Sequence, residues 1–166
     1  LLPLPISSAA IGISMGLTGL AAGAATIGCC CNMVGFAVIS YRENKFGGLI
    51  AQGIGTSMIQ MPNIVRNPLI WLPSIISSAI LGPVASAALK MVSNPIGSGM
   101  GSAGLVGQFM AYTSMIKAGV SPVVTVIEII VMHFIAPAAL SLAVAEGMRK
   151  LKLIKPNDLK LVDANA

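Results

Sequence analysis

The sequence predicts an all-α fold, a polytopic bundle of transmembrane helices with broken or re-entrant segments. Hydrophobic residues make up 55% of the 166 positions and charged residues only 9%, whereas a soluble domain carries about 25% charged residues. The mean hydropathy is +0.89. The chain also contains 18 Gly and 10 Pro, and both residue types interrupt regular helix. We therefore expect membrane lipid as the main surroundings of the chain.

Charged residues divide the chain into uncharged runs that set the expected helices, since one crossing needs about 20 apolar residues. The first run, 1–41, has room for two crossings, or for one crossing and a hairpin. Together the runs predict four to six membrane segments in one transmembrane region, 1–148. The later runs are 46–65, 67–89, 91–116 and 118–145, the last of them interrupted by Glu128 and His133.

Small residues crowd the first run, and small residues let membrane helices approach closely. Gly12 to Gly16 and Gly19 to Gly23 both match the GxxxG pattern. Two interpretations stay open. The glycines pack helices inside the bundle, or they form the contact of a homodimer.

One break in the apolar sequence falls at 61–68, where Pro62 and Pro68 flank Arg66. An extramembrane loop and a re-entrant turn both fit this stretch.

The stretch from Asn94 to Gln108 is the most informative break. It holds Pro95 and five glycines and carries no charge. Broken backbone at membrane depth survives only inside protein or beside a wet cavity, so we expect it to face a cavity that also receives Glu128. A strip of glycines and hydroxyls without charge suits a neutral, hydroxylated ligand. The candidate substrate-binding residues are Asn94, Gly97, Gly99, Gly101, Ser102 and Gln108.

Glu128 and His133 are ionisable residues within the last run, and such residues usually face a bundle interior or a cavity. Their separation of five residues places them about 140° apart on a straight helix, so they do not form a metal pair and we expect no metal site. Pro137 frees the carbonyl of His133 from its helical partner, and a bend there could bring both side chains into one pocket. Both are candidate substrate-binding residues. A structural hydrogen bond between helices is the alternative for each.

The tail 149–166 carries five of the ten Lys and Arg residues. Cytoplasmic segments of membrane proteins are enriched in these residues. If each run crosses once and the tail is cytoplasmic, eight basic residues lie inside, and Arg66 and Lys117 lie outside. We therefore predict a solvated, basic, cytoplasmic tail. A re-entrant run would reverse the alternation for everything before it.

Several function classes are excluded or disfavoured. Aromatic residues make up only 4% of the chain, too few for base stacking, so we expect no nucleic-acid partner. The glycines of 94–108 have no following Lys-Ser/Thr, as a phosphate loop requires. Cys29, Cys30 and Cys31 are consecutive and predict neither a disulfide framework nor a metal site. We expect no cofactor and no enzyme activity.

Four stretches together resemble one family, the phosphotransferase-system EIIC-like integral membrane proteins, in particular the perfringolysin-regulator-like branch. They run from Gly53 to Asn63, Pro68 to Pro73, Leu81 to Pro83 and Asn94 to Gln108. The resemblance covers about 6–155, and because members of that branch are longer, the chain looks like a C-terminal half.

The resemblance implies a sugar-permease fold in the bacterial cell membrane, with re-entrant hairpins and a membrane-embedded acid that Glu128 would match. An EIIB-type protein would have to supply any phosphoryl group. We therefore predict an EIIC-type component that binds and translocates a small hydroxylated solute. The alternatives are a non-transporting membrane sensor or regulator and a passive helical subunit.

Overall fold

Three of the uncharged runs form helices long and apolar enough to cross a membrane. The computed structural model describes residues 8–161, and within them these helices are Gly19–Ile39, Pro68–Ala88 and Pro122–Lys150. The described residues contain helices and turns but no strand, apart from one isolated bridge between Gly19 and Ser93. The prediction of an all-α membrane bundle is confirmed.

Several of the helices are short. One-turn π-helical segments at Ala51–Gly55, Val84–Ala88 and Val131–Ile135 join several of them. The α-helices are α1 (Ser8–Ser14), α2 (Gly19–Ile39), α3 (Tyr41–Ile50), α4 (Met61–Arg66), α5 (Leu72–Pro83), α6 (Pro95–Met100), α7 (Val106–Lys117), α8 (Pro122–Ile130) and α9 (Ala136–Lys150).

The prediction of one crossing per uncharged run is wrong for 46–65 and 91–116. Neither run holds a helix of spanning length in the structure. Instead, 46–65 folds into the end of α3, a π-helical turn, a 3₁₀ turn and the start of α4, and 91–116 folds into α6 and most of α7. Glycines lie at both breaks: Gly53 and Gly55 lie where one helix ends, and Gly101 and Gly104 adopt positive φ between α6 and α7.

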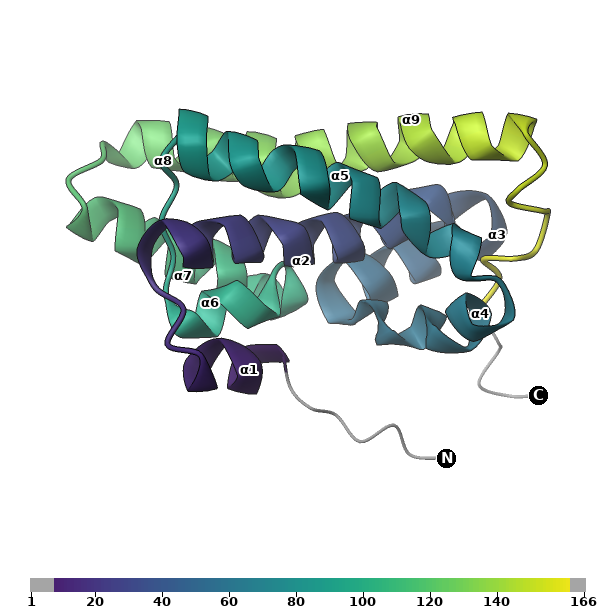
Figure 1. Ribbon diagram of the computed structural model, residues 1–166, viewed down its shortest axis with the longest axis horizontal. Coiled ribbons are helices and arrows are strands. Elements are labelled where there is room, and N and C mark those ends of the chain that lie inside the picture. Colours follow the sequence, from purple (N-terminus) through teal and green to yellow (C-terminus); the bar gives the residue numbers. More distant parts are fainter. Residues whose placement is uncertain (1–7, 162–166) are drawn as a thin grey trace.

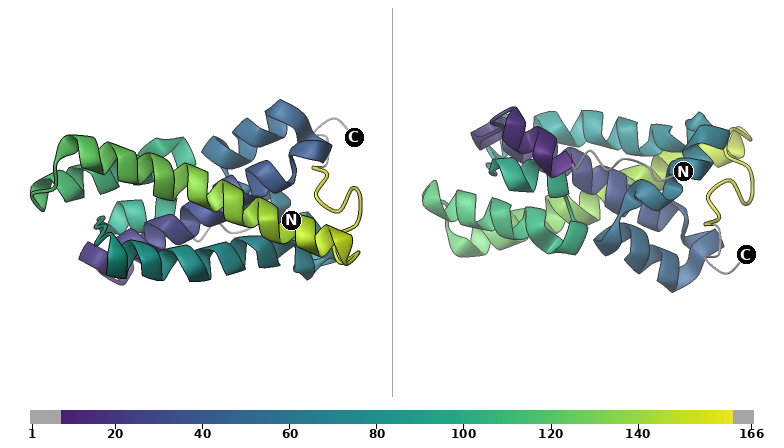
Figure 2. Two further views of the ribbon diagram at one scale, coloured as in Figure 1. Left: turned by 90° about the horizontal axis from the view of Figure 1, so that it is seen from above. Right: turned by 90° about the horizontal axis from the view of Figure 1, so that it is seen from below.

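Helix α2 is the centre of the bundle. It packs on α5 and α9, which lie side by side on one of its faces, and on α6 (Figures 1 and 2). Ile27 and Cys31 of α2 contribute to one hydrophobic core, and Phe36 and Ile39 contribute to a second one nearer its C-terminus. All four side chains are buried.

Two glycines of the first run pack inside the chain. A Cβ atom on Gly12 would collide with Ser98 and the carbonyl of Pro95, and one on Gly23 would collide with the backbone of Met91. Small side chains let backbones approach this closely. Of the two interpretations of the GxxxG patterns, the structure supports packing within the bundle for Gly12 and Gly23.

The long axis of the bundle separates its basic residues into two groups. The segments 41–66 and 149–160 lie at one end, and the turns 89–94 and 117–122 lie at the other (Figure 1). The count stays at eight against two, although Arg66 and Lys90 exchange sides relative to the one-crossing-per-run expectation. The first end holds Arg42, Lys45, Arg66, Arg149, Lys150, Lys152, Lys155 and Lys160, and the second holds Lys90 and Lys117.

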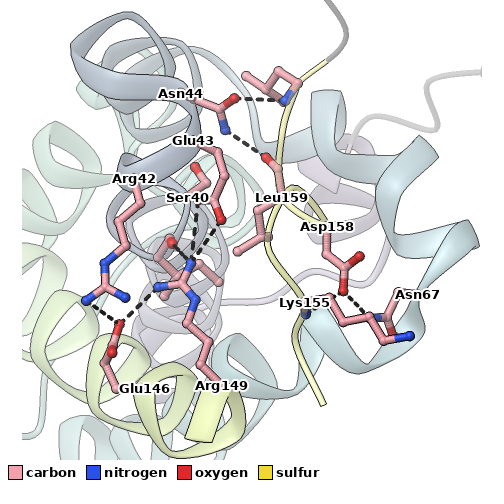
Figure 3. A network of polar contacts seen from close by, with 12 residues as sticks. Ser40, Arg42, Glu43, Asn44, Asn67, Glu146, Arg149, Lys155, Asp158 and Leu159 are labelled. Carbon is pink, nitrogen blue, oxygen red and sulfur yellow. Dashed lines mark hydrogen bonds and ion pairs between the residues drawn. The ribbon is translucent and has the colours of Figure 1, made fainter. Parts of the chain in front are cut away.

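Most residues of 151–161 are exposed, as expected of a solvated tail, but the segment is docked on the bundle. Ile154 and Leu159 are buried in the second core. Side-chain amides hold the backbone of this segment: the Nε2 group of Gln60 and the Nδ2 group of Asn44 both donate to the carbonyl oxygen of Leu159, at 3.0 and 2.7 Å (Figure 3 shows Asn44). The tail therefore closes the basic end of the bundle. Residues 162–166 lie outside the described part.

Candidate functional site

The segment 94–108 is a broken helix, as its glycines predict. Asn94 begins α6 by accepting a hydrogen bond from the Gly97 amide at 2.9 Å, and α6 ends after six residues at Met100. Gly101, Gly104 and Leu105 then take positive φ before α7 begins. The segment packs along α2 and α1. Gly101 and Ser102 of the break are buried, whereas Gly104 and Leu105 are exposed.

Two contacts fix this segment to the middle of the bundle. Gly101 lies against α2, where an added Cβ would come within 2.7 Å of the Cβ of Cys29. The hydroxyl of Ser102 is fully buried and donates to the carbonyl of Gly53 at 2.6 Å. The second contact joins the two broken runs, 46–65 and 91–116, to each other. Gly101 and Ser102 are thus positioned by structural contacts.

The other predicted residues of this segment also make internal contacts. The Nδ2 group of Asn94 donates to the sulfur of Met110 at 3.0 Å. The Nε2 group of Gln108 lies 3.5 Å from the sulfur of Cys30, and its Oε1 is buried without a hydrogen-bond partner among the described residues. Gly97 packs against Ser93 and Met110, and Gly99 lies within α6. Solute contacts by these residues stay predictions.

A pocket of about 300 Å³ lies between α2, α5 and α6. Small side chains leave the space: Ala25 and Gly28 of α2, and Ser74 and Ser78 of α5. Ser98 is the residue through which the segment 94–108 reaches it. The full lining is Ala25, Gly28, Cys29, Asn32, Trp71, Ser74, Ile75, Ser78 and Ser98.

The polar groups of this pocket are partly linked to one another. The Nε1 group of Trp71 donates to the Oδ1 of Asn32 at 3.1 Å, which joins the start of the second span to the middle of the first. The Oγ of Ser74 is buried and has no hydrogen-bond partner among residues 8–161. Polar side chains facing one another between membrane helices mark substrate pathways in many membrane proteins. The lining offers an amide, hydroxyls and an aromatic ring, but no charge.

Glu128 and His133 do not line this pocket. Glu128 lies on α8 with its Oε2 buried and unpartnered among the described residues. His133 lies in the π-helical turn Val131–Ile135, is 1% exposed, and has an unpartnered Nδ1. Their assignment to the solute site stays a prediction. Within residues 8–161 no group of three or more His, Cys, Asp or Glu residues could hold a metal ion.

Comparison with known families assigns the chain. A family model described as "Phosphotransferase system, EIIC" matches residues 1–161. The chain belongs to the phosphotransferase-system EIIC family. No curated protein and no solved structure gave a significant match.

The family and the three apolar helices agree on the class of protein. An EIIC-family chain is a multi-pass membrane component of a sugar-permease type. The spans Gly19–Ile39 and Pro68–Ala88 of this EIIC chain are the ones that enclose the pocket. The pocket therefore lies between two helices of spanning length.

Sequence reasoning identified the broken segment but missed the pocket residues. Asn32, Trp71 and Ser74 were not among the predicted candidates. Asn32 had a usable signal, because an amide inside an otherwise uncharged, apolar run is costly unless partnered. Trp71 and Ser74 had none, since their part in the pocket depends on how α5 packs against α2.

Proposed function

We propose that this EIIC-family chain binds a small, neutral, hydroxylated solute of the sugar class in the pocket between α2, α5 and α6, and helps to translocate it. The observation that carries the proposal is an uncharged pocket between two helices of spanning length, mainly apolar but with the polar side chains of Asn32, Trp71 and Ser78 in its lining. A volume of about 300 Å³ is at the lower end of the range of small-molecule sites, about 300–1,000 Å³, and suits a single small solute.

The chemistry of the lining supports a sugar-like ligand. Asn32 offers an amide and Ser78 offers a hydroxyl. The Ser78 hydroxyl donates to the Ile75 carbonyl at 2.8 Å, and its oxygen can still accept a hydrogen bond. Trp71 supplies an apolar ring held in place by its bond to Asn32. A ligand with hydroxyls on a carbon ring could satisfy both kinds of surface, whereas a charged ligand would find no counter-ion here.

Glu128 is a second location for solute contact in this proposal. Its buried, unpartnered Oε2 could accept hydroxyl hydrogen bonds, which are stronger to a carboxylate than to a neutral oxygen. His133, Asn94, Gly97, Gly99, Gly101, Ser102 and Gln108 remain candidate substrate-binding residues with it. In a transport cycle the solute would contact these residues and the pocket at different stages.

Filling the pocket tests the first location. Ser78→Leu is expected to abolish saturable binding of sugars, because the added side chain occupies the pocket that Ser78 lines. Ser86→Leu is the matched control, since Ser86 lies on the same span and also bonds its own helix backbone, but does not line the pocket. The measurement is ligand-dependent thermal stabilisation over a panel of labelled sugars, followed by uptake into proteoliposomes.

The outcomes separate the functional classes. Loss of binding in Ser78→Leu with normal binding in Ser86→Leu supports the pocket, and equal binding in both variants would contradict it. Glu128→Gln is expected to weaken binding by about 1–3 kcal/mol, the scale of hydrogen bonds to charged groups, if the solute contacts Glu128. Binding without uptake would select a membrane sensor over a permease component.

We further propose that the basic end faces the cytoplasm of a bacterial cell and that an EIIB-type protein docks there. The eight-to-two distribution of Lys and Arg supports this orientation. With the native cysteines replaced, a cysteine at Asn165 is expected to resist membrane-impermeant thiol reagents in intact cells, and one at Ser121 is expected to react. The reverse pattern would overturn the orientation.

A further inference from the structure

An apolar groove lies between α3 and α9 at the basic end of the bundle. Its volume is about 600 Å³ and its lining is Val38, Tyr41, Phe46, Leu49 and Leu142, together with Arg42 and Arg149. It begins where the span Gly19–Ile39 ends, so it lies at the level of a membrane interface. Tyr41 and Phe46 are 48% and 66% exposed there, as is usual for aromatic side chains at that level.

A second, more polar pocket of about 560 Å³ adjoins this groove and shares Arg42 and Arg149 with it. Its lining adds Glu43, Ile154, Pro156, Asn157 and Lys160. The tail therefore forms one wall, which places a basic residue of the tail beside the basic residues of α3 and α9. The groove and the pocket together are apolar at one end and cationic at the other.

The arginines have different roles in this end of the bundle (Figure 3). Arg149 is committed to the fold: it donates to the Ile39 carbonyl at 2.7 Å and pairs with Glu43 and Glu146 at 3.4 and 2.9 Å. The side chain of Arg42 is 66% exposed and has one ion pair, to Glu146 at 3.2 Å. Lys160 is exposed. Arg42 and Lys160 are therefore the two cationic side chains of this pocket that can bind an anionic ligand.

We propose that the groove and the adjoining pocket form a binding site for an anionic phospholipid. One acyl chain would lie in the apolar groove, and the phosphate would lie on Arg42 and Lys160. An anionic phospholipid matches both the apolar groove and the cationic pocket. A sugar has no apolar chain to fill the groove, and a zwitterionic lipid carries no net charge to pair with the cations. Basic pockets at the membrane surface bind anionic headgroups in this way. The proposal rests on membrane embedding alone and is independent of the solute pocket.

Native mass spectrometry of the detergent-purified protein tests the site, with phosphatidylglycerol and phosphatidylcholine of identical acyl chains as probes. The parent is expected to retain phosphatidylglycerol preferentially. Arg42→Gln and Lys160→Gln are each expected to lower that preference about fivefold, the attraction of one basic side chain for an anionic surface. Lys90→Gln and Lys117→Gln, at the opposite end, are the matched controls and are expected to leave it unchanged.

Glu146→Gln gives a change in the opposite direction. Removing the carboxylate that pairs with Arg42 frees that cation, so phosphatidylglycerol binding is expected to increase, which a loss of folding could not produce. Phe46→Ala is expected to weaken the binding of phosphatidylglycerol. Free glycerol phosphate is expected not to displace the bound lipid from the parent protein. The proposal would be overturned by equal retention of both lipids, or by an unchanged lipid preference in Arg42→Gln and Lys160→Gln. Displacement of phosphatidylglycerol by glycerol phosphate, or a dimer that carries no lipid, would also overturn it.

Discussion

Gly101→Ala is expected to disrupt the broken segment 94–108 and to destabilise the protein by about 2–6 kcal/mol. Two costs add. The backbone at φ 54 and ψ −129 is strained for any residue with a Cβ, at about 1–3 kcal/mol. The new Cβ would also lie 2.7 Å from the Cβ of Cys29 and 2.9 Å from its carbonyl carbon, and overpacking of this kind costs about 1–3 kcal/mol more.

Gly104→Ala is the matched control, because Gly104 lies in the same segment at φ 53 but would meet nothing closer than 3.9 Å. Its ψ of 21 places it in the left-handed α region, so Gly104→Ala is expected to show a smaller backbone strain and no clash. The measurement is the thermal unfolding midpoint in detergent, read from intrinsic fluorescence and from aggregation. A Gly101→Ala protein that unfolds at or above the temperature of Gly104→Ala would contradict the close contact with α2.

Gln60→Leu is expected to release the tail from the bundle. Gln60 is fully buried. Its Nε2 donates to the Oε1 of Gln52 and to the carbonyl of Leu159, at 2.9 and 3.0 Å, and its Oε1 accepts from Asn63 at 2.8 Å. Leucine leaves the Oε1 of Gln52 buried without its donor, and an unsatisfied buried polar group costs about 1–3 kcal/mol. It also removes one of the two hydrogen bonds to the Leu159 carbonyl, the other coming from Asn44.

Gln108→Leu is the matched control, because it makes the same substitution at a buried glutamine whose side chain has little hydrogen bonding to lose. Within residues 8–161 its side chain makes one hydrogen bond, the 3.5 Å contact to Cys30, and its Oε1 is already unpartnered there. Limited trypsin cleavage after Lys152 and Lys160 measures release of the tail, since Pro156 protects the bond after Lys155. Faster cleavage in Gln60→Leu but not in Gln108→Leu is the expected result, and equal rates in the two variants would contradict the docked tail.

The sequence predicted the class of fold because that class depends on local composition. Uncharged runs of about 20 residues identified the spans, and the glycines of 94–108 identified a break that the structure contains. The sequence alone did not determine which of the uncharged runs cross the membrane. The runs 46–65 and 91–116 are long enough to do so, but they fold back because turns at Gly53 and Gly101 are stabilised by contacts with each other's segments.

The pocket and the docked tail depend on packing between distant residues. Asn32 and Trp71 are 39 positions apart, and Gln60 and Leu159 are 99 apart. No pattern in one stretch reveals such pairs. The tail did carry a signal, since Ile154 and Leu159 are apolar residues among the lysines, and the run 46–65 held unexplained amides, Gln52, Gln60 and Asn63, that now serve as its partners.

The native thiol of Cys29 gives the most direct test of the proposed solute site, because it lines the pocket. With Cys30 and Cys31 replaced by alanine, the rate of Cys29 alkylation is measured over a panel of sugars. A bound sugar is expected to slow the reaction saturably, and Asn32→Ala is expected to weaken that protection about tenfold, from loss of its hydrogen bond and of its hold on Trp71. A sugar that the protein demonstrably binds or transports, yet that leaves the alkylation rate of Cys29 unchanged, would contradict the account.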